Sequence, residues 1–254
     1  MLGVRRRGVG NPPARPLLGG CDYILLGLFD MSTLGLVHGG GFGAWCWEPL
    51  IPELAARGHR AATVDLTPEA QAAGAVRCAE IVAEAFATID DLVLVGHSLA
   101  GLIIPLVAAE RPLRRLVFLH ALLPRPGLSV VDQLAEEPDM FNPAMFAAKR
   151  PFWEDEEVAR HFLLHDCAPD VAREAFRRLR PEPGALGRER TPLQSWPAIP
   201  CAYIVCAEDR TATPGWARRA ARDRLGVEPV EIASGHCPFL SRPRELAEAL
   251  VLYG

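Results

Sequence analysis

The sequence contains almost no lysine, no apolar run long enough to span a membrane, and no internal repeat. Lys149 is its only lysine, and its formal net charge is −4 with a pI near 6.0. This charge balance gives no reason to expect nucleic acid as a partner. The apolar run at residues 23–29 is far too short to span a bilayer, and no internal repeat or low-complexity array is visible. We therefore expect neither a nucleic-acid partner nor a membrane span.

Paired cysteines are also missing. The chain has seven cysteines, an odd number, and no Cys-x-x-Cys pair, which argues against both a disulfide framework and a zinc knuckle. Cys46, Cys78, Cys201 and Cys206 read as small apolar residues that fill a core. Free cysteines of this kind are typical of a reducing compartment, so we expect a cytoplasmic protein.

Residues 1–30 show no hydrophobic period. Their basic cluster at residues 5–7 is followed by prolines and not by an apolar segment, which argues against a secretory or twin-arginine signal. We predict that residues 1–30 are a disordered extension, that Met31 is the natural start, and that residues 31–254 form the folded domain.

Strand-like and helix-like segments alternate along the rest of the chain. At 50% hydrophobic composition, 254 residues can bury a large core. The alternation predicts an α/β protein with a mostly parallel central sheet and helices on both faces. The expected strands are 33–37, 60–64, 91–95, 115–120, 201–206 and 230–233, and the expected helices include 47–57, 75–89 and 98–110.

The alternation stops in a proline-rich stretch at residues 124–199, which holds short helical pieces. We interpret this stretch as a helical cap inserted after a sheet strand. Its aromatic side chains, including Phe141, Phe146 and Trp153, are predicted to cover the active site and form the substrate pocket. The alternative, that these aromatics only hold the cap on the core, stays open.

A serine lies on a predicted sharp turn between a strand and a helix. The apolar residues 92–95 lead into residues 96–101, which read Gly-His-Ser-Leu-Ala-Gly. Small neighbours allow the strand and helix to approach closely, and the turn exposes the Ser98 hydroxyl as a nucleophile for acyl transfer. His97 lies within this turn and is predicted to line the site. The alternative is a degenerate turn of the same kind in a non-catalytic protein.

A nucleophilic serine needs a base, and the base needs an orienting carboxylate. Asp209 and His236 each follow an expected strand, and the order serine, acid, histidine is the order that this kind of fold uses. We predict Asp209 as the acid and His236 as the base, with Glu208 as the fallback acid. Asp65 also ends a strand but lies too early in the chain, so it reads as a loop residue.

A glycine-rich loop follows the first expected strand. Residues 38–43 read His-Gly-Gly-Gly-Phe-Gly, and such glycine density lets backbone N–H groups approach a ligand closely. We predict that the N–H groups of Gly40 and Leu99 form an oxyanion hole.

These motifs together resemble a known family. The chain is similar to α/β-hydrolases of the group that contains plant methyl esterases, hydroxynitrile lyases and their bacterial esterase relatives. The resemblance covers roughly residues 32–253, and the Gly-Ala-Trp-x-Trp segment at residues 43–47 is fairly specific for the group. It implies a cofactor-free enzyme acting on a small or medium apolar ester. The matching stretches are 37–47, 58–66, 96–101, 203–210 and 235–240.

Two positions favour the esterases of this group over its lyases. The lyases that resemble this chain carry Thr after the first-loop His and Lys after the catalytic His, where this chain has Gly39 and Cys237. Without the lysine ammonium, nothing obvious stabilises a departing cyanide. We expect Gly39 to leave room for an acyl group and a water, and Cys237 to shape the pocket wall, with a reactive thiol as the alternative. His120 follows a strand and is predicted to face the same pocket.

The predicted function is therefore that of a serine hydrolase that cleaves a small to medium apolar carboxylic ester through an acyl-enzyme. A lyase or other cofactor-free C–C cleaving enzyme using the same triad is the alternative, followed by a non-catalytic ligand-binding protein. His161 and His165, with Asp166 beside them, have a spacing that can bind metal on a helix, but it is too generic to predict a site. We expect no cofactor and no metal; a small-molecule ester is the expected partner, and a homodimer stays open.

Overall fold

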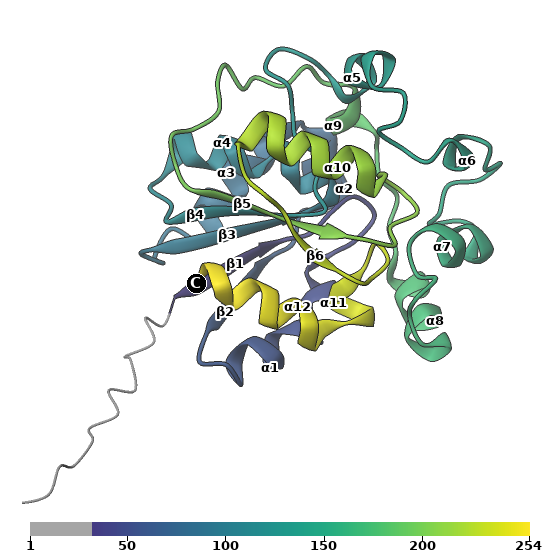
Figure 1. Ribbon diagram of the computed structural model, residues 1–254, viewed down its shortest axis with the longest axis horizontal. Coiled ribbons are helices and arrows are strands. Elements are labelled where there is room, and N and C mark those ends of the chain that lie inside the picture. The colour runs from purple at the N-terminus through teal and green to yellow at the C-terminus, as the bar shows by residue number, and fades with distance from the viewer. Residues whose placement is uncertain (1–31) are drawn as a thin grey trace, which may run out of the picture.

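A computed structural model describes residues 32–254, so the predictions for residues 1–30 and for Met31 as the natural start lie outside the described residues. Its centre is a six-stranded sheet with the order β2-β1-β3-β4-β5-β6, and every pair of neighbouring strands is parallel. This arrangement confirms the predicted parallel sheet (Figure 1). The strands are β1 Thr33–Val37, β2 Arg60–Val64, β3 Leu92–His97, β4 Arg115–Leu119, β5 Cys201–Cys206 and β6 Val230–Ile232.

Helices cover both faces of this sheet. In Figure 1, α1, α11 and α12 lie on one face, and α3, α4 and α10 lie on the other. The α-helices are α1 Leu50–Ala55, α2 Pro68–Ala72, α3 Ala75–Ala85, α4 Ile104–Glu110, α5 Val130–Glu136, α6 Pro143–Phe146, α7 Glu156–Phe162, α8 Pro169–Arg178, α9 Ala185–Arg188, α10 Pro214–Ala220, α11 Pro238–Ser241 and α12 Pro243–Leu250. Short 3₁₀ turns are η1 Ala44–Trp47, η2 Ser98–Leu102 and η4 Val251–Tyr253, and η3 Ala221–Leu225 is a π-helical turn.

The hydrophobic core has two halves because successive strand residues point to opposite faces of the sheet. Leu92 and Leu94 of β3 pack in the cluster that contains residues of α3, α4 and α10. Val93 and Val95 pack in the cluster that contains residues of α1 and α12. All of β3 is buried, which explains why its sequence is a continuous apolar run and not an alternating one.

The helix predicted at residues 98–110 is interrupted. The structure has the 3₁₀ turn η2, then Ile103 with φ −102° and ψ −51°, and then α4. Pro105 lies in the first turn of α4 and has no N–H, so it cannot donate the helical hydrogen bond back to the Gly101 carbonyl. A new helix begins there instead of one helix continuing.

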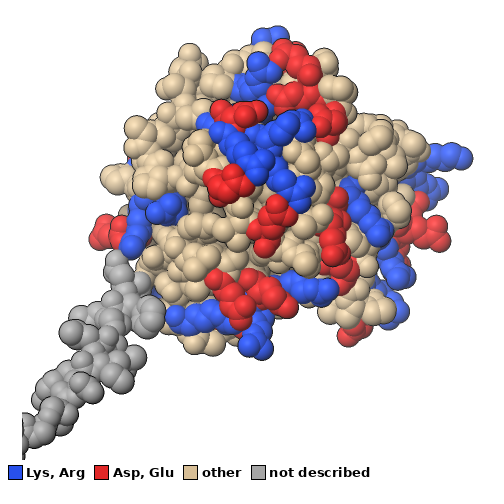
Figure 2. Space-filling model, in the orientation of Figure 1, with Lys and Arg blue, Asp and Glu red and all other residues tan. Residues whose placement is uncertain are grey.

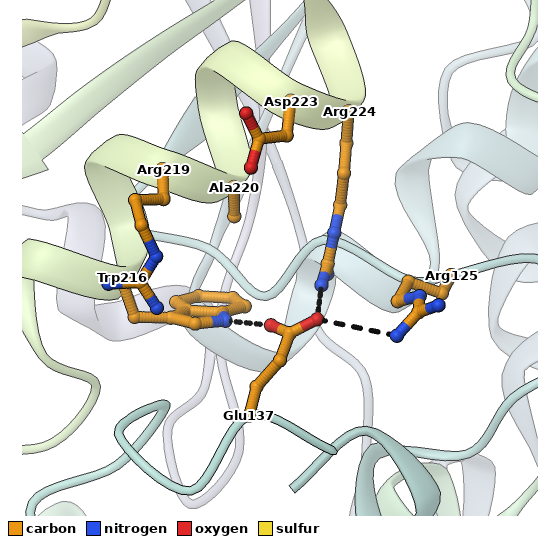
Figure 3. A pocket seen from close by; sticks show the side chains of 7 residues that line it. All are labelled: Arg125, Glu137, Trp216, Arg219, Ala220, Asp223 and Arg224. Atoms are coloured by element: carbon orange, nitrogen blue, oxygen red, sulfur yellow. Dashed lines mark hydrogen bonds and ion pairs between the residues drawn. The ribbon is translucent and has the colours of Figure 1, made fainter.

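The stretch predicted as a cap, residues 124–199, falls between β4 and β5 and contains α5 to α9. An ionic cluster joins it to the core domain (Figure 3). Glu137, directly after α5, pairs with Arg224 and accepts a hydrogen bond from the Trp216 indole N–H. The Arg224 guanidinium also lies 5.5 Å from the centre of the Trp216 ring. These contacts hold the start of the inserted segment against α10 and η3.

The surface carries charges of both signs. Figure 2 shows acidic and basic side chains interspersed on one face of the molecule, and many form ion pairs, such as Arg218 with Glu231 at 2.7 Å. Of the helices in residues 32–254, none combines the length and the apolar character needed to cross a membrane.

Candidate active site

Ser98 occupies a strained turn directly after the central strand β3. Its φ is +53°, in the left-handed region that costs a non-glycine residue about 1–3 kcal/mol. The turn is so tight that a Cβ on Gly101 would lie 1.9 Å from the Leu122 carbonyl oxygen, and one on Gly96 would lie 2.9 Å from Ile104. Only glycine fits at Gly101, so the small residues of the motif at 96–101 are needed to let the chain approach itself this closely.

His236 and Asp209 form a buried pair at the ends of β6 and β5. The His236 Nδ1 and Asp209 Oδ2 atoms are 2.5 Å apart, and both residues are less than one-tenth exposed. Burial by itself raises the pKa of Asp209, but His236, His120 and hydrogen bonds outweigh burial and hold this pKa well below its usual range. Glu208, the fallback acid, is exposed to solvent. The structure therefore pairs the histidine with Asp209.

Thr211 contacts both members of this pair and was not predicted from the sequence. Its backbone N–H and its hydroxyl donate to the Asp209 Oδ1 atom at 2.6 and 2.7 Å. The hydroxyl oxygen also lies 2.9 Å from His236 Nδ1. Thr211 lies two residues after Asp209. A hydroxyl at that spacing after an acid can hydrogen-bond the carboxylate within the same loop, so this spacing is a local sequence signal that could have identified Thr211.

We expect Thr211→Val to lower kcat for ester hydrolysis by about tenfold, because it removes one hydrogen bond to Asp209 while keeping the side-chain volume. KM should change little, since the hydroxyl bonds the buried Asp209–His236 pair. Thr213→Val is the matched control: it removes the side-chain cap of α10, so it should lower the melting temperature without this loss of kcat. Equal kcat values for the two variants would contradict the role given to Thr211.

His120 lies behind the pair and is fully buried. The Cys206 backbone N–H donates to its Nδ1 at 2.8 Å, so the proton of the neutral ring sits on Nε2. Nε2 lies 3.0 Å from the Ala212 carbonyl oxygen and 3.4 Å from Asp209 Oδ2. His120 therefore lies beside the same Asp209 oxygen that His236 contacts, and it does not line the cavity that contains Ser98, which corrects the prediction for it.

His97 is also fully buried, beneath His236. Its Nε2 donates to the His236 carbonyl oxygen at 2.9 Å, and its ring packs 4.6 Å from the His236 ring and 4.9 Å from the Phe239 ring. The prediction that His97 lines the pocket is wrong, because the residue before the turn points into the core when Ser98 points out of it.

These two histidines predict how stability depends on pH. Burial lowers the pKa of both His97 and His120 from the ordinary value of 6.5. Below that value the unfolded chain binds protons that the folded protein excludes, so stability is full above it and declines as pH falls. The expected loss is roughly 1 kcal/mol per pH unit for each histidine.

Urea unfolding at about pH 7.5 and about pH 5.5 measures this decline. His97→Gln should make the dependence shallower, whereas His161→Gln, at an exposed position, should leave it unchanged. An equal free energy of unfolding at the two pH values would contradict this prediction, because it would mean that the pKa values of the two rings are the same in the folded and the unfolded protein.

One cavity of about 210 Å³ brings Ser98 and His236 together. Its walls are mostly apolar. Phe141 lines it as predicted, whereas Met145 and Phe152 are lining residues that were not predicted individually. The full set of lining residues is Gly40, Ser98, Leu99, Leu122, Val130, Phe141, Met145, Phe152, Glu182, Gly187, Thr211, Ala212 and His236.

Three further pocket predictions are corrected, because these side chains do not line this cavity. The Phe146 side chain is 64% exposed and packs its ring edge-on against Phe141. Trp153 packs against Phe152, which takes the lining position instead. Cys237 is fully buried in the core, and burial raises the pKa of its thiol well above its usual range. Cys237 is therefore an inert core residue and not a pocket wall.

The predicted oxyanion loop lies against the serine. A Cβ on Gly39 would be 2.9 Å from the Ser98 Cβ and 3.0 Å from the His97 ring. A side chain would therefore not fit at Gly39, and Gly39 does not line the cavity, whereas the neighbouring Gly40 does. The loop is held by His38, whose Nε2 accepts a hydrogen bond from the Leu66 N–H at 2.9 Å.

His161 and His165 do not share a helix, because α7 ends at Phe162. His165 Nε2 lies 3.1 Å from the Glu208 carbonyl oxygen, and Asp166 accepts a hydrogen bond from the Gly235 N–H at 2.8 Å. Both side chains thereby pack the inserted segment against the loops that carry Asp209 and His236. Elsewhere, donor atoms of His120, Cys206 and Asp209 lie within 4.8 Å of one another, but the histidine and the acid are engaged in the hydrogen bonds described above.

Comparison with known proteins identifies the family. The model of the alpha/beta hydrolase family matches residues 36–249, and the chain belongs to this family. Methylesterase 9 of Arabidopsis thaliana is 28% identical over 251 residues, covering 87% of this chain and 97% of its own. The probable esterase PIR7A of Oryza sativa subsp. indica is 29% identical over 252 residues, covering 85% and 94%. These relatives confirm the predicted resemblance to plant esterases and support the prediction of a carboxylic ester hydrolase.

Solved structures agree on the fold. Polyneuridine aldehyde esterase matches with a TM-score of 0.73 at 23% identity, covering 87% of this chain and 98% of its own. An extracellular alpha/beta-hydrolase from a Paenibacillus species matches with a TM-score of 0.73 at 24% identity, covering 88% and 99%. The α/β-hydrolase fold predicted from the sequence is thus confirmed.

Proposed function

We propose that this protein is a serine esterase that cleaves a small to medium apolar carboxylic ester through an acyl-enzyme. The observation that carries the proposal is the buried Asp209–His236 pair, which opens onto the same cavity as Ser98 on its strained turn. The lining of this cavity is mostly apolar and includes Leu122 and Phe141, which suits an apolar substrate. The esterase relatives support the same reaction class.

The proposed reaction begins with proton transfer from Ser98 to His236. Asp209 accepts a hydrogen bond from the protonated Nδ1 of the ring, so Nε2 is the nitrogen that takes the serine proton. The Ser98 oxygen attacks the ester carbonyl, and the N–H groups of Gly40 and Leu99 stabilise the oxyanion. His236 then protonates the leaving alcohol as the C–O bond breaks, and the acyl group remains on Ser98.

Water completes the cycle. His236 removes a proton from a water molecule, the resulting oxygen attacks the acyl carbon, and the carboxylic acid leaves as Ser98 regains its proton. Asp209 stabilises the imidazolium that forms in each half of the reaction and keeps the neutral ring in the productive tautomer.

Hydrolysis of p-nitrophenyl acetate and butyrate, measured beside cleavage of mandelonitrile, tests the reaction class. We expect turnover of both esters, little cleavage of the cyanohydrin, and covalent labelling of Ser98 by a fluorophosphonate located by peptide mass spectrometry. Rapid cyanohydrin cleavage with negligible ester turnover would favour a lyase instead. Absence of both activities and of the label would favour a non-catalytic binding protein.

A further inference from the structure

A short segment of the inserted region, residues 179–184, reaches across the predicted oxyanion loop. The Arg180 backbone N–H donates to the Gly41 carbonyl oxygen at 2.8 Å, and its guanidinium donates to the Phe42 carbonyl oxygen at 2.6 Å. The same guanidinium binds both carboxylate oxygens of Asp65 at 2.9 Å. The fork geometry of arginine makes this a strong two-point attachment. The segment is therefore fixed relative to the loop that carries Gly40.

Glu182 lies in this segment between two prolines and extends to the oxyanion loop. A Cβ placed on Gly40 would lie 2.7 Å from the Glu182 Cγ and 3.6 Å from its carboxyl carbon. Glu182 also lines the cavity that contains Ser98 and His236. A carboxyl group thus stands next to the position where the proposed mechanism develops negative charge.

The carboxyl of Glu182 is only partly satisfied. The Gly184 N–H donates to its Oε1 at 2.7 Å. Within residues 32–254, no ion pair or hydrogen bond engages its Oε2. No arginine or lysine lines the cavity, and the neighbouring Arg188 donates to the Pro183 carbonyl oxygen at 2.8 Å. Burial raises the pKa of Glu182, although the Gly184 N–H and the charge of the nearby Arg188 both act in the opposite direction.

We propose that Glu182 selects the substrate by charge, so that the site prefers an ester bearing a protonated amine and rejects an ester bearing a carboxylate. This inference rests on the esterase function proposed above and adds a substrate class to it. A substrate ammonium would pair with the free Oε2 atom and offset the repulsion between Glu182 and the oxyanion. A substrate carboxylate would add a second negative charge to a cavity that has no basic side chain except His236.

Three methyl esters of similar size and different charge test this inference: β-alanine methyl ester, methyl butanoate and monomethyl succinate. We expect kcat/KM to fall in that order in the unaltered protein at neutral pH. Glu182→Gln should reduce the ratio of kcat/KM for the amine ester to that for the carboxylate ester by at least about tenfold. The value for methyl butanoate in each enzyme is the reference, so a uniform loss of activity cancels.

Glu154→Gln is the matched control, because it removes the same charge from an exposed position in the inserted region. It should leave the ratio unchanged. An identical ratio in Glu182→Gln and the unaltered protein, with methyl butanoate hydrolysed by both, would overturn the role of Glu182 alone. Failure of the unaltered protein to hydrolyse methyl butanoate and p-nitrophenyl butyrate would overturn the proposed esterase function itself.

Discussion

Ser98→Ala is expected to lower kcat for p-nitrophenyl butyrate by at least about a thousandfold. Alanine removes the only atom that can form the acyl-enzyme in the proposed mechanism. It keeps the Cβ, so the turn and its φ of +53° at this position should be retained. The remaining rate should come from the oxyanion hole and substrate binding.

The measurement is steady-state turnover together with fluorophosphonate labelling of intact protein. Ser195→Ala is a suitable control because Ser195 is exposed and lies outside the cavity. It should retain both activity and label. Retention of ester turnover in Ser98→Ala, with circular dichroism unchanged, would mean that another group is the nucleophile.

Asp209→Asn is expected to lower kcat by about three to four orders of magnitude without unfolding the protein. The reason lies in the hydrogen bonds of Thr211, whose N–H and hydroxyl both donate to Oδ1 of Asp209. An asparagine must keep its oxygen at that position to accept them, so its NH₂ group takes the place of Oδ2 beside His236 Nδ1. A donor facing Nδ1 forces the ring proton onto Nε2, the wrong tautomer for a base.

Steady-state kinetics of Asp209→Asn and of Glu208→Gln separate this role from a general charge effect. Glu208 is adjacent in sequence but exposed, so Glu208→Gln should stay within about threefold of the unaltered kcat. The melting temperature of Asp209→Asn checks that the loss is chemical and not structural. Full activity in Asp209→Asn would transfer the role of the acid to another residue.

Much of the fold, and the residues of the proposed reaction, could be predicted from local sequence patterns. The strand boundaries expected at 33–37, 60–64 and 201–206 coincide with β1, β2 and β5. Buried parallel strands are continuous apolar runs, and the turn after β3 requires small residues, so both leave a local pattern. The helix expected at 98–110 is two shorter elements in the structure, η2 and α4. The apolar spacing predicted one helix, but Pro105 lacks the N–H that a continuous helix needs there.

Pocket residues were predicted less well, for a geometric reason. His97 ends β3 and His120 directly follows β4, so both lie near the site. In the structure, both rings point into the core, where they bond the backbone of distant segments. Among the aromatics of the inserted segment, a shift of one residue separates Trp153 from the lining residue Phe152. A one-residue difference reverses the side of a segment that a side chain occupies.

The amino-acid sequence alone determined the order of strands and helices, the turn that presents Ser98, and the positions of a candidate acid and base after later strands. These depend on neighbours a few residues apart. The tertiary structure was needed to show that the Thr211 hydroxyl lies 2.9 Å from His236 Nδ1, that His97 and His120 are buried, and that Glu182 lies next to Gly40. Such contacts join segments far apart in the chain, and they exist only once the inserted region has packed on the sheet.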